Sequence, residues 1–163
     1  VGRHATMSES DELAAVRQVL IERAEEPGAL LPILHDVQDA LGYIPPHTVT
    51  TIAEGVNLSR AEVHGVITYY HHFRGHPPGR HVVQICRAEA CQSMGADALM
   101  AHAELRLGCG SHGTTADGQF TLEPVFCLGL CASSPALTID GEVHARVSAQ
   151  TFDALIEAAR SQA

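Results

Sequence analysis

Four of the five cysteines in this 163-residue chain fall into two close pairs, and this spacing constrains its structure more than any other feature. Cys86 and Cys91 are separated by four residues, Cys127 and Cys131 by three, and thirty-five residues lie between the pairs. Each pair begins where a predicted β-strand runs into a loop. Because strand ends of one sheet can lie side by side, we expect the two loops to meet around one metal centre.

The spacing favours one kind of centre over its alternatives. A [2Fe–2S] cluster takes four thiolates, two on each iron, and two close pairs suit that requirement. Structural zinc sites prefer pairs separated by two residues, a [4Fe–4S] ferredoxin has a C-x2-C-x2-C run, and a thioredoxin-type dithiol has C-x2-C. Scattered buried cysteines are the remaining alternative, since cysteine often behaves as a small hydrophobic residue. We therefore favour a [2Fe–2S] centre over a zinc-stabilised interaction domain.

Two further features of the sequence are interpreted as having no chemical role. Cys109 stands alone in a glycine-rich stretch and is interpreted as a plain loop thiol, with a spare or exchangeable cluster ligand as the alternative. A G-x-G-x2-G match begins at Gly108, but it follows a predicted helix and no helix opens after it, so we expect no nucleotide site there. The sequence shows no recognisable serine–histidine–aspartate grouping, so we expect no catalytic residue in this chain.

The composition indicates a folded protein that does not bind nucleic acid. With 45% hydrophobic residues the chain can bury a core, and a net charge of −9 argues against the basic face that phosphates require. No apolar run reaches the roughly 18–20 residues of a membrane span, and no signal peptide is recognised. We therefore expect a cytoplasmic protein, in which thiols stay reduced and clustered cysteines indicate metal or redox chemistry.

The first half of the chain has the periodicity of amphipathic helices. Ser10 is expected to cap the first helix, and Ser59 with Glu62 forms a predicted capping box. Residues 1–6, which precede a methionine, are interpreted as a cloning remnant. The predicted helices run from Ser10 to the Glu26-Pro27-Gly28 break, over 30–41, over 49–56 and from Ser59 to Tyr70.

After the glycine- and proline-rich stretch at 74–80, strands alternate with helices. The predicted elements are a strand at 81–85, a helix at 94–107, a loop at 108–118, strands at 120–126, 136–139 and 142–147, and a helix at 148–160. Asp140-Gly141 predicts a hairpin turn. The sequence thus predicts an α+β protein: a four-helix segment over 10–74, then an α/β domain of about four strands over 80–163 with the order of a thioredoxin-like core.

Several motifs together resemble the small thioredoxin-like [2Fe–2S] subunit family. They are Cys86-x4-Cys91, Cys127-Leu-Gly-Leu-Cys131-Ala-Ser-Ser-Pro135, Gly42-Tyr-Ile-Pro-Pro46 and Gly65-Val-Ile-Thr-Tyr-Tyr70-His-His-Phe73. That family includes the small iron–sulfur subunit of NADH dehydrogenase (complex I), its counterpart in NAD-reducing hydrogenases, and the gamma subunit of NAD-dependent molybdenum formate dehydrogenases. The resemblance covers about residues 13–160 and implies that Cys86, Cys91, Cys127 and Cys131 ligate the cluster.

The resemblance also implies partners. A flavin subunit would carry FMN and the NAD site, and we expect the N-terminal helices to dock this chain onto it. The loop Cys86-Arg-Ala-Glu-Ala-Cys91-Gln-Ser-Met-Gly is more similar to formate dehydrogenase gamma subunits than to complex I members, which usually follow the first ligand with Gly-Thr. We therefore favour a formate dehydrogenase with a molybdenum-containing catalytic subunit, and complex I and NAD-reducing hydrogenase are the alternatives.

Overall fold

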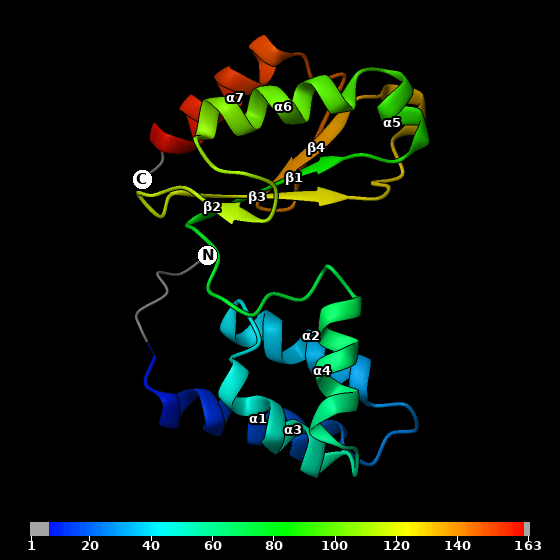
Figure 1. Cartoon of the computed structure of the whole chain (residues 1–163), viewed down its shortest axis with the longest axis vertical. Helices are drawn as coiled ribbons and strands as arrows, with labels where there is room; N and C mark the ends of the chain where they lie inside the picture. The colour runs from blue at the N-terminus through cyan, green and yellow to red at the C-terminus, as the bar shows by residue number, and fades with distance from the viewer. Residues whose placement is uncertain (1–6, 162–163) are drawn as a thin grey trace. The chain divides into compact units, whose positions relative to one another are not determined.

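The computed structural model describes residues 7–161, which Figure 1 colours from blue to red along the chain. The chain divides into two compact units, with the boundary between Pro77 and Pro78. The first unit is helical and the second combines helices with a five-stranded sheet, so the predicted mixture of helix and sheet is confirmed. Residues 1–6, interpreted above as a cloning remnant, lie outside the described residues. Within residues 7–161, no helix has the length and apolar character needed to span a membrane.

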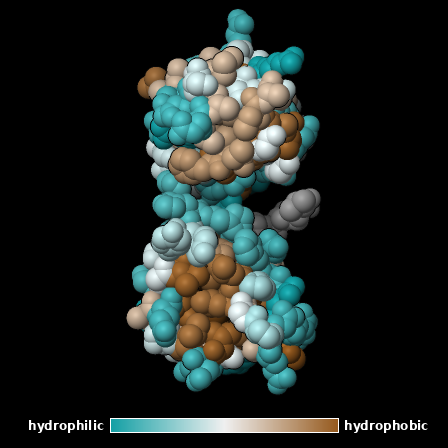
Figure 2. Space-filling model, turned by 90° about the vertical axis from the view of Figure 1, so that its right-hand side faces the viewer, coloured by the Kyte–Doolittle hydropathy of each residue, from teal (hydrophilic) through white to brown (hydrophobic). Residues whose placement is uncertain are grey.

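The helical unit buries one hydrophobic core between its helices. Its elements are α1 (Glu9–Arg23), α2 (Leu30–Leu41), the 3-10 turn η1 (Pro46–Thr48), α3 (Val49–Gly55) and α4 (Arg60–Tyr69). The core side chains with no exposed surface are Val16, Ile33, Leu34, Ile52 and Val63. Further hydrophobic residues gather on the surface of this unit, in the lower half of Figure 2.

Both α1 and α4 begin with a capping box. The predicted box at α4 is confirmed: Ser59 Oγ accepts from the Glu62 amide, and the Glu62 carboxylate accepts from the Ser59 amide at 2.8 Å. The prediction that Ser10 caps α1 was wrong, because Ser8 is the cap and exchanges the same bonds with Asp11. A capping box needs a reciprocating side chain three residues after the cap, and three residues after Ser10 is an apolar leucine.

A buried carboxylate connects α1 to the segment that follows α2. Glu12 is 7% exposed; its Oε1 accepts a 2.5 Å hydrogen bond from the Tyr43 hydroxyl, and its Oε2 lies 3.5 Å from His47 Nε2. The hydrogen bond to Glu12, with burial and the carboxylate's charge, raises the pKa of Tyr43 to about 12. Since this pKa lies above its ordinary value of about 10, the contact stabilises the fold below pH 10, and that stability is lost as the pH rises towards 12.

The second unit is built on a sheet with the strand order β2-β3-β1-β4-β5. The strands are β1 (His81–Cys86), β2 (Gly113–Thr114), β3 (Phe120–Val125), β4 (Ala136–Ile139) and β5 (Glu142–Ala145). β1 and β3 are parallel, whereas the other neighbouring strands are antiparallel. β2 lies inside the stretch 108–118 that was predicted to be a loop, because a strand of two residues has no alternation to detect. The predicted Asp140-Gly141 turn joins β4 to β5, with positive φ at both residues.

Three helices accompany the sheet: α5 (Glu89–Ser93), α6 (Ala96–Leu107) and α7 (Ala149–Ser161). The prediction of one helix from Met94 to Leu107 was wrong at its start, because Gly95 adopts a left-handed conformation with φ 93° between α5 and α6. Glycine adopts that conformation at little cost, so it ends one helix and begins the next. Helices α6 and α7 lie over one side of the sheet (Figure 1) and share a core with Phe120, Leu122 and Leu137.

We expect Tyr43→Phe to lower the free energy of unfolding of the helical unit by about 1.5–3 kcal/mol at pH 7, as for a lost hydrogen bond to a charged group. Denaturant unfolding followed by circular dichroism measures this change, and the tyrosine absorbance titration should lose its step near pH 12. The control is Tyr69→Phe at a side chain that is 75% exposed, expected to stay within about 0.5 kcal/mol. Equal stability of the two variants would contradict the role of the contact.

Candidate metal centre

The register of two strands brings the cysteine-bearing loops together. β1 and β3 are adjacent and parallel, and Cys86 at the end of β1 pairs with Val125 at the end of β3. Both strands therefore release their loops at one edge of the sheet. Cys91 lies in α5 on the first loop, Cys127 lies on the second, and Cys131 begins the 3-10 turn η2 (Cys131–Ser133). This arrangement agrees with the expectation that each pair starts at a strand end.

The four paired cysteines lie near one another at this end of the sheet. The Cys91 thiol and the Cys127 amide of the other loop both lower the pKa of the Cys86 thiol. The sulfur atoms of Cys127 and Cys131 are 3.8 Å apart. Charge interactions further connect Cys131 with Cys91 and Cys86. The structure thus brings together all four residues selected from the sequence.

Backbone amides from both loops point at the Cys86 sulfur. Burial by itself would raise the pKa of this thiol, but hydrogen bonds from the amides of Ala88, Leu128 and Cys127, with the neighbouring thiol, hold it below its ordinary value. Cys127 has a φ of 112°, a rare conformation for a residue with a side chain. Its own sulfur accepts a 3.3 Å hydrogen bond from the Gly129 amide. The loop backbone is therefore shaped to donate hydrogen bonds to sulfur.

The four sulfurs favour a bound cation by their mutual repulsion. The pKa of Cys131 is raised first by its hydrogen bond with Cys127 and by the negative charge of the Cys127 thiolate, and further by the thiolate charges of Cys91 and Cys86. Four thiolates gathered this closely repel one another. A cationic group bound among them would relieve the repulsion, because a metal holds its coordinating thiols in the deprotonated form.

The two cysteine pairs differ in their exposure. Cys86 and Cys91 are each 2% exposed, whereas Cys127 and Cys131 are exposed at the surface. The buried pair belongs to a small hydrophobic cluster completed by Ala96 and Ala136, on which the partly buried residues Ala88, Val125, Leu128 and Leu130 pack. One side of the site is therefore dry and the other faces outward.

The donor set fits a [2Fe–2S] cluster. Two thiolates on one tetrahedral metal with metal–sulfur bonds of about 2.3 Å lie about 3.8 Å apart, which is the Cys127–Cys131 spacing. A [2Fe–2S] cluster requires two such pairs, and Cys86 with Cys91 forms the second. Within the described part of the chain, no group of three or more histidine, cysteine, aspartate or glutamate side chains has the geometry to hold a single metal ion.

A polar network beside the buried pair has no signal in the periodicity of the sequence. Asp97, in the first turn of α6, accepts hydrogen bonds from Arg87 at 2.8 and 3.1 Å and from Gln92 at 3.1 Å. These hydrogen bonds hold the pKa of Asp97 below its ordinary value. Only the positions of Arg87 and Gln92, each directly after a cysteine, could have drawn attention to the network.

Cys109 lies apart from the four paired cysteines. It follows the C-terminal end of α6 and packs, half-buried, against the main core of the sheet unit rather than the small cluster around Cys86. Burial, followed by the charges of Glu104 and Asp117, raises the pKa of its thiol. These surroundings agree with the interpretation of Cys109 as a loop thiol.

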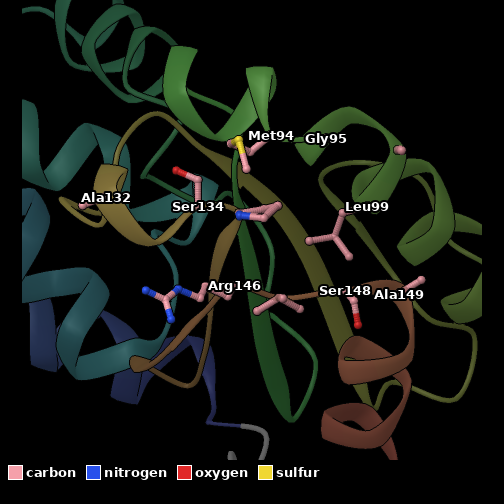
Figure 3. A pocket seen from close by; sticks show the side chains of 11 residues that line it. Met94, Gly95, Leu99, Ala132, Ser134, Arg146, Ser148 and Ala149 are labelled. Atoms are coloured by element: carbon pink, nitrogen blue, oxygen red, sulfur yellow. The ribbon is translucent and has the colours of Figure 1, made fainter.

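A pocket of about 590 Å³ opens beside η2 (Figure 3). Its wall is mostly apolar and includes Met94, Leu99 and Val147, and Arg146 is the one charged residue among the eleven that line it. Ala132 and Ser134, which closely follow Cys131, also line it. None of the cysteines is among the lining residues.

Comparisons with known proteins agree with this geometry. A family model described as thioredoxin-like [2Fe–2S] ferredoxin matches residues 16–160. The E subunit of NADH-quinone oxidoreductase from Pseudomonas aeruginosa is 36% identical over 135 residues, which cover 82% of this chain and 81% of that protein. The corresponding protein from Escherichia coli K12 is 33% identical over 155 residues, covering 92% and 93%. A crystal structure of an NAD+-reducing [NiFe]-hydrogenase in the H2-reduced state matches with a TM-score of 0.67 and 26% identity; the match covers 82% of this chain but 22% of the hydrogenase chain.

Replacing Cys86, Cys91, Cys127 or Cys131 individually by Ser should abolish or strongly deplete bound iron, because three thiolates leave one iron short of a ligand. Iron content and the visible spectrum of each purified variant measure this loss. Cys109→Ser is the matched control and should leave both unchanged, since it lies in a different hydrophobic cluster. Loss of the spectrum in Cys109→Ser with retention in Cys91→Ser would overturn the ligand assignment.

Proposed function

Because this chain belongs to the thioredoxin-like [2Fe–2S] ferredoxin family, we propose that it is a non-catalytic electron-transfer subunit of an NAD-linked oxidoreductase. Cys86, Cys91, Cys127 and Cys131 hold one [2Fe–2S] cluster in this proposal. The observation that carries it is the meeting of four thiols and several sulfur-directed amides at the shared end of β1 and β3. The bound cluster supplies one-electron chemistry, for which the protein provides ligands and surroundings.

The residues around the site have separate tasks in this proposal. The buried cysteines and the small apolar cluster exclude water from one side of the centre. The amides of Ala88, Leu128 and Gly129 donate to sulfur and offset negative charge on the ligands, a contact that tunes reduction potential. The exposed cysteines, Cys127 and Cys131, face outward, so a redox partner can approach the centre from that side.

The partners follow from the relatives, whose names tie them to NADH or NAD+. We place FMN and the NAD site on a separate flavin subunit of the same assembly. The cytoplasmic location expected from the thiol chemistry also belongs to this proposal.

Three kinds of parent complex are candidates: an NADH-quinone oxidoreductase, an NAD-reducing hydrogenase and a formate dehydrogenase. The relatives named above are parts of NADH-quinone oxidoreductases and a hydrogenase, and a formate dehydrogenase is not among them. The preference for formate dehydrogenase rests on the sequence of the loop from Cys86 to Gly95 alone. It stays as a candidate, and it requires a molybdenum-containing catalytic partner. Affinity capture of the tagged chain from its native source, with mass spectrometry of the captured subunits, separates these candidates.

The purified chain should contain two irons and two acid-labile sulfides per molecule and be reddish-brown. After reduction it should give the S = 1/2 electron paramagnetic resonance signal of a [2Fe–2S] centre and lose colour. A zinc-stabilised interaction domain would instead be colourless, with one zinc and no sulfide, and that composition would refute the proposal.

The helical unit is the part that we propose docks onto the flavin subunit. Tyr69, at the end of α4, is 75% exposed, and its ring packs edge-on against Tyr70 with centroids 5.1 Å apart. Exposed tyrosines are frequent energetic anchors of protein interfaces. The hydrophobic surface of the helical unit in Figure 2 supports the same role. The alternative is that the helices pack only within this chain.

Tyr69→Ala should therefore weaken binding to the flavin subunit by about tenfold or more, the effect of losing an interface anchor. Titration of the full chain against the purified flavin subunit by calorimetry measures the affinity. Leu105→Ala is the control, because Leu105 is a large side chain, 85% exposed, on α6 of the other unit. Equal affinities for the two variants would count against docking through this end of α4.

A further inference from the structure

Asp97 connects the two positions that follow the buried cysteines. Arg87 comes directly after Cys86, and Gln92 directly after Cys91. Arg87 donates to Oδ1 of Asp97 from Nε at 3.1 Å and from Nη2 at 2.8 Å. Gln92 donates to Oδ2 from Nε2 at 3.1 Å. One carboxylate thus uses both of its oxygens, one for the residue that follows each buried cysteine.

Asp97 is itself held on a rigid element. It is the second residue of α6, and α6 is anchored in the core of the sheet unit by Leu99, Met100 and Ala103. An acidic side chain in the first turn of a helix is also stabilised by the helix dipole. The backbone of Asp97 is therefore held in place relative to the sheet, and its side chain, which is 49% exposed, reaches the loop from there.

The loop between the two cysteines is also held by the sheet and by the small hydrophobic cluster, in which Cys91 and Ala88 pack. The Arg87 amide continues the sheet by donating to the Val125 carbonyl at 2.8 Å. Beyond it, α5 has five residues and no side-chain cap at its N-terminus. A helix this short is not stable by itself, so the place of Cys91 depends on tertiary contacts. Asp97 supplies one of them through Gln92.

We infer that Asp97 is a positioning residue for the cluster, which fixes the relative placement of Cys86 and Cys91 and balances the charge of Arg87 beside them. This inference rests on the proposed function, since it assumes that both cysteines are ligands. Residues that hydrogen-bond metal ligands directly commonly change metal affinity by about 10–100-fold when they are replaced. Asp97 bonds to the residues beside the ligands through a partly exposed ion pair, so its effect should be smaller.

The charge of Asp97 should affect the reduction potential of the cluster, a quantity that a purely structural contact would leave unchanged. Reduction adds one negative charge to the cluster. Removal of the Asp97 charge leaves the Arg87 guanidinium uncompensated, and a nearby cation favours the more negative state. The reduction potential should therefore rise in Asp97→Asn, which keeps the size of the side chain, as well as in Asp97→Ala.

The matched control is Glu157→Gln. Glu157 pairs with Arg106 at 2.5 Å, near the other end of α6, about 14 Å further along the helix axis. This variant removes the same charge from the same unit without touching the cysteine loop. Each full-length variant is loaded with its cluster, and two quantities are measured: the half-life of the visible absorbance in excess iron chelator, and the reduction potential by redox titration.

Asp97→Ala should shorten that half-life by up to about fivefold, as for the loss of a partly exposed ion pair, Asp97→Asn by less, and only the Asp97 variants should raise the potential. If both Asp97 variants match Glu157→Gln in half-life and potential, the inference is overturned. A shorter half-life with an unchanged reduction potential would refute the part of the inference that concerns the charge of Arg87. If Asp97→Ala does not fold, the two measurements on Asp97→Asn test the inference. Wild-type protein without iron would instead refute the proposed function.

Discussion

The parallel pairing of β1 with β3 is the constraint on which the candidate centre depends. Parallel neighbours end at the same edge of a sheet, and the register sets Cys86 opposite Val125. The two loops therefore leave the sheet as neighbours although thirty-five residues separate the cysteine pairs. A shift of this register by one residue would move Cys86 to the opposite face of the sheet and separate it from the amides that donate to its sulfur.

The electrostatics of the site follow from that meeting of loops. Four sulfurs close together raise the pKa of Cys131, while amides aimed at Cys86 lower the pKa of that thiol. The two shifts have different causes: backbone donors favour the thiolate at Cys86, and the neighbouring sulfurs disfavour it at Cys131. Backbone donors are also insensitive to most side-chain substitutions, so loops of different sequence can provide the same surroundings for sulfur.

The sequence predicts most of the fold and the meeting of the four paired cysteines, and its failures have physical causes. The order of elements along the chain, the Asp140-Gly141 turn and the Ser59 capping box depend on local patterns, which single residues signal clearly. The start of α6 depends on the backbone conformation of Gly95, and β2 on pairing with a neighbouring strand. The Asp97 network depends on which side chains meet after folding, and no spacing rule encodes that.

The same network bears on the disagreement over the parent complex. The preference for formate dehydrogenase came from residues such as Arg87 and Gln92 in the cysteine loop, whereas the relatives named above are quinone-linked or hydrogenase proteins. In the structure these two side chains bond to Asp97 of the same chain. These internal bonds give both residues a role in supporting the loop of their own chain. A loop built to hold its own cysteines carries little information about the reaction of the assembly, and the surfaces that meet the partner are the better guide.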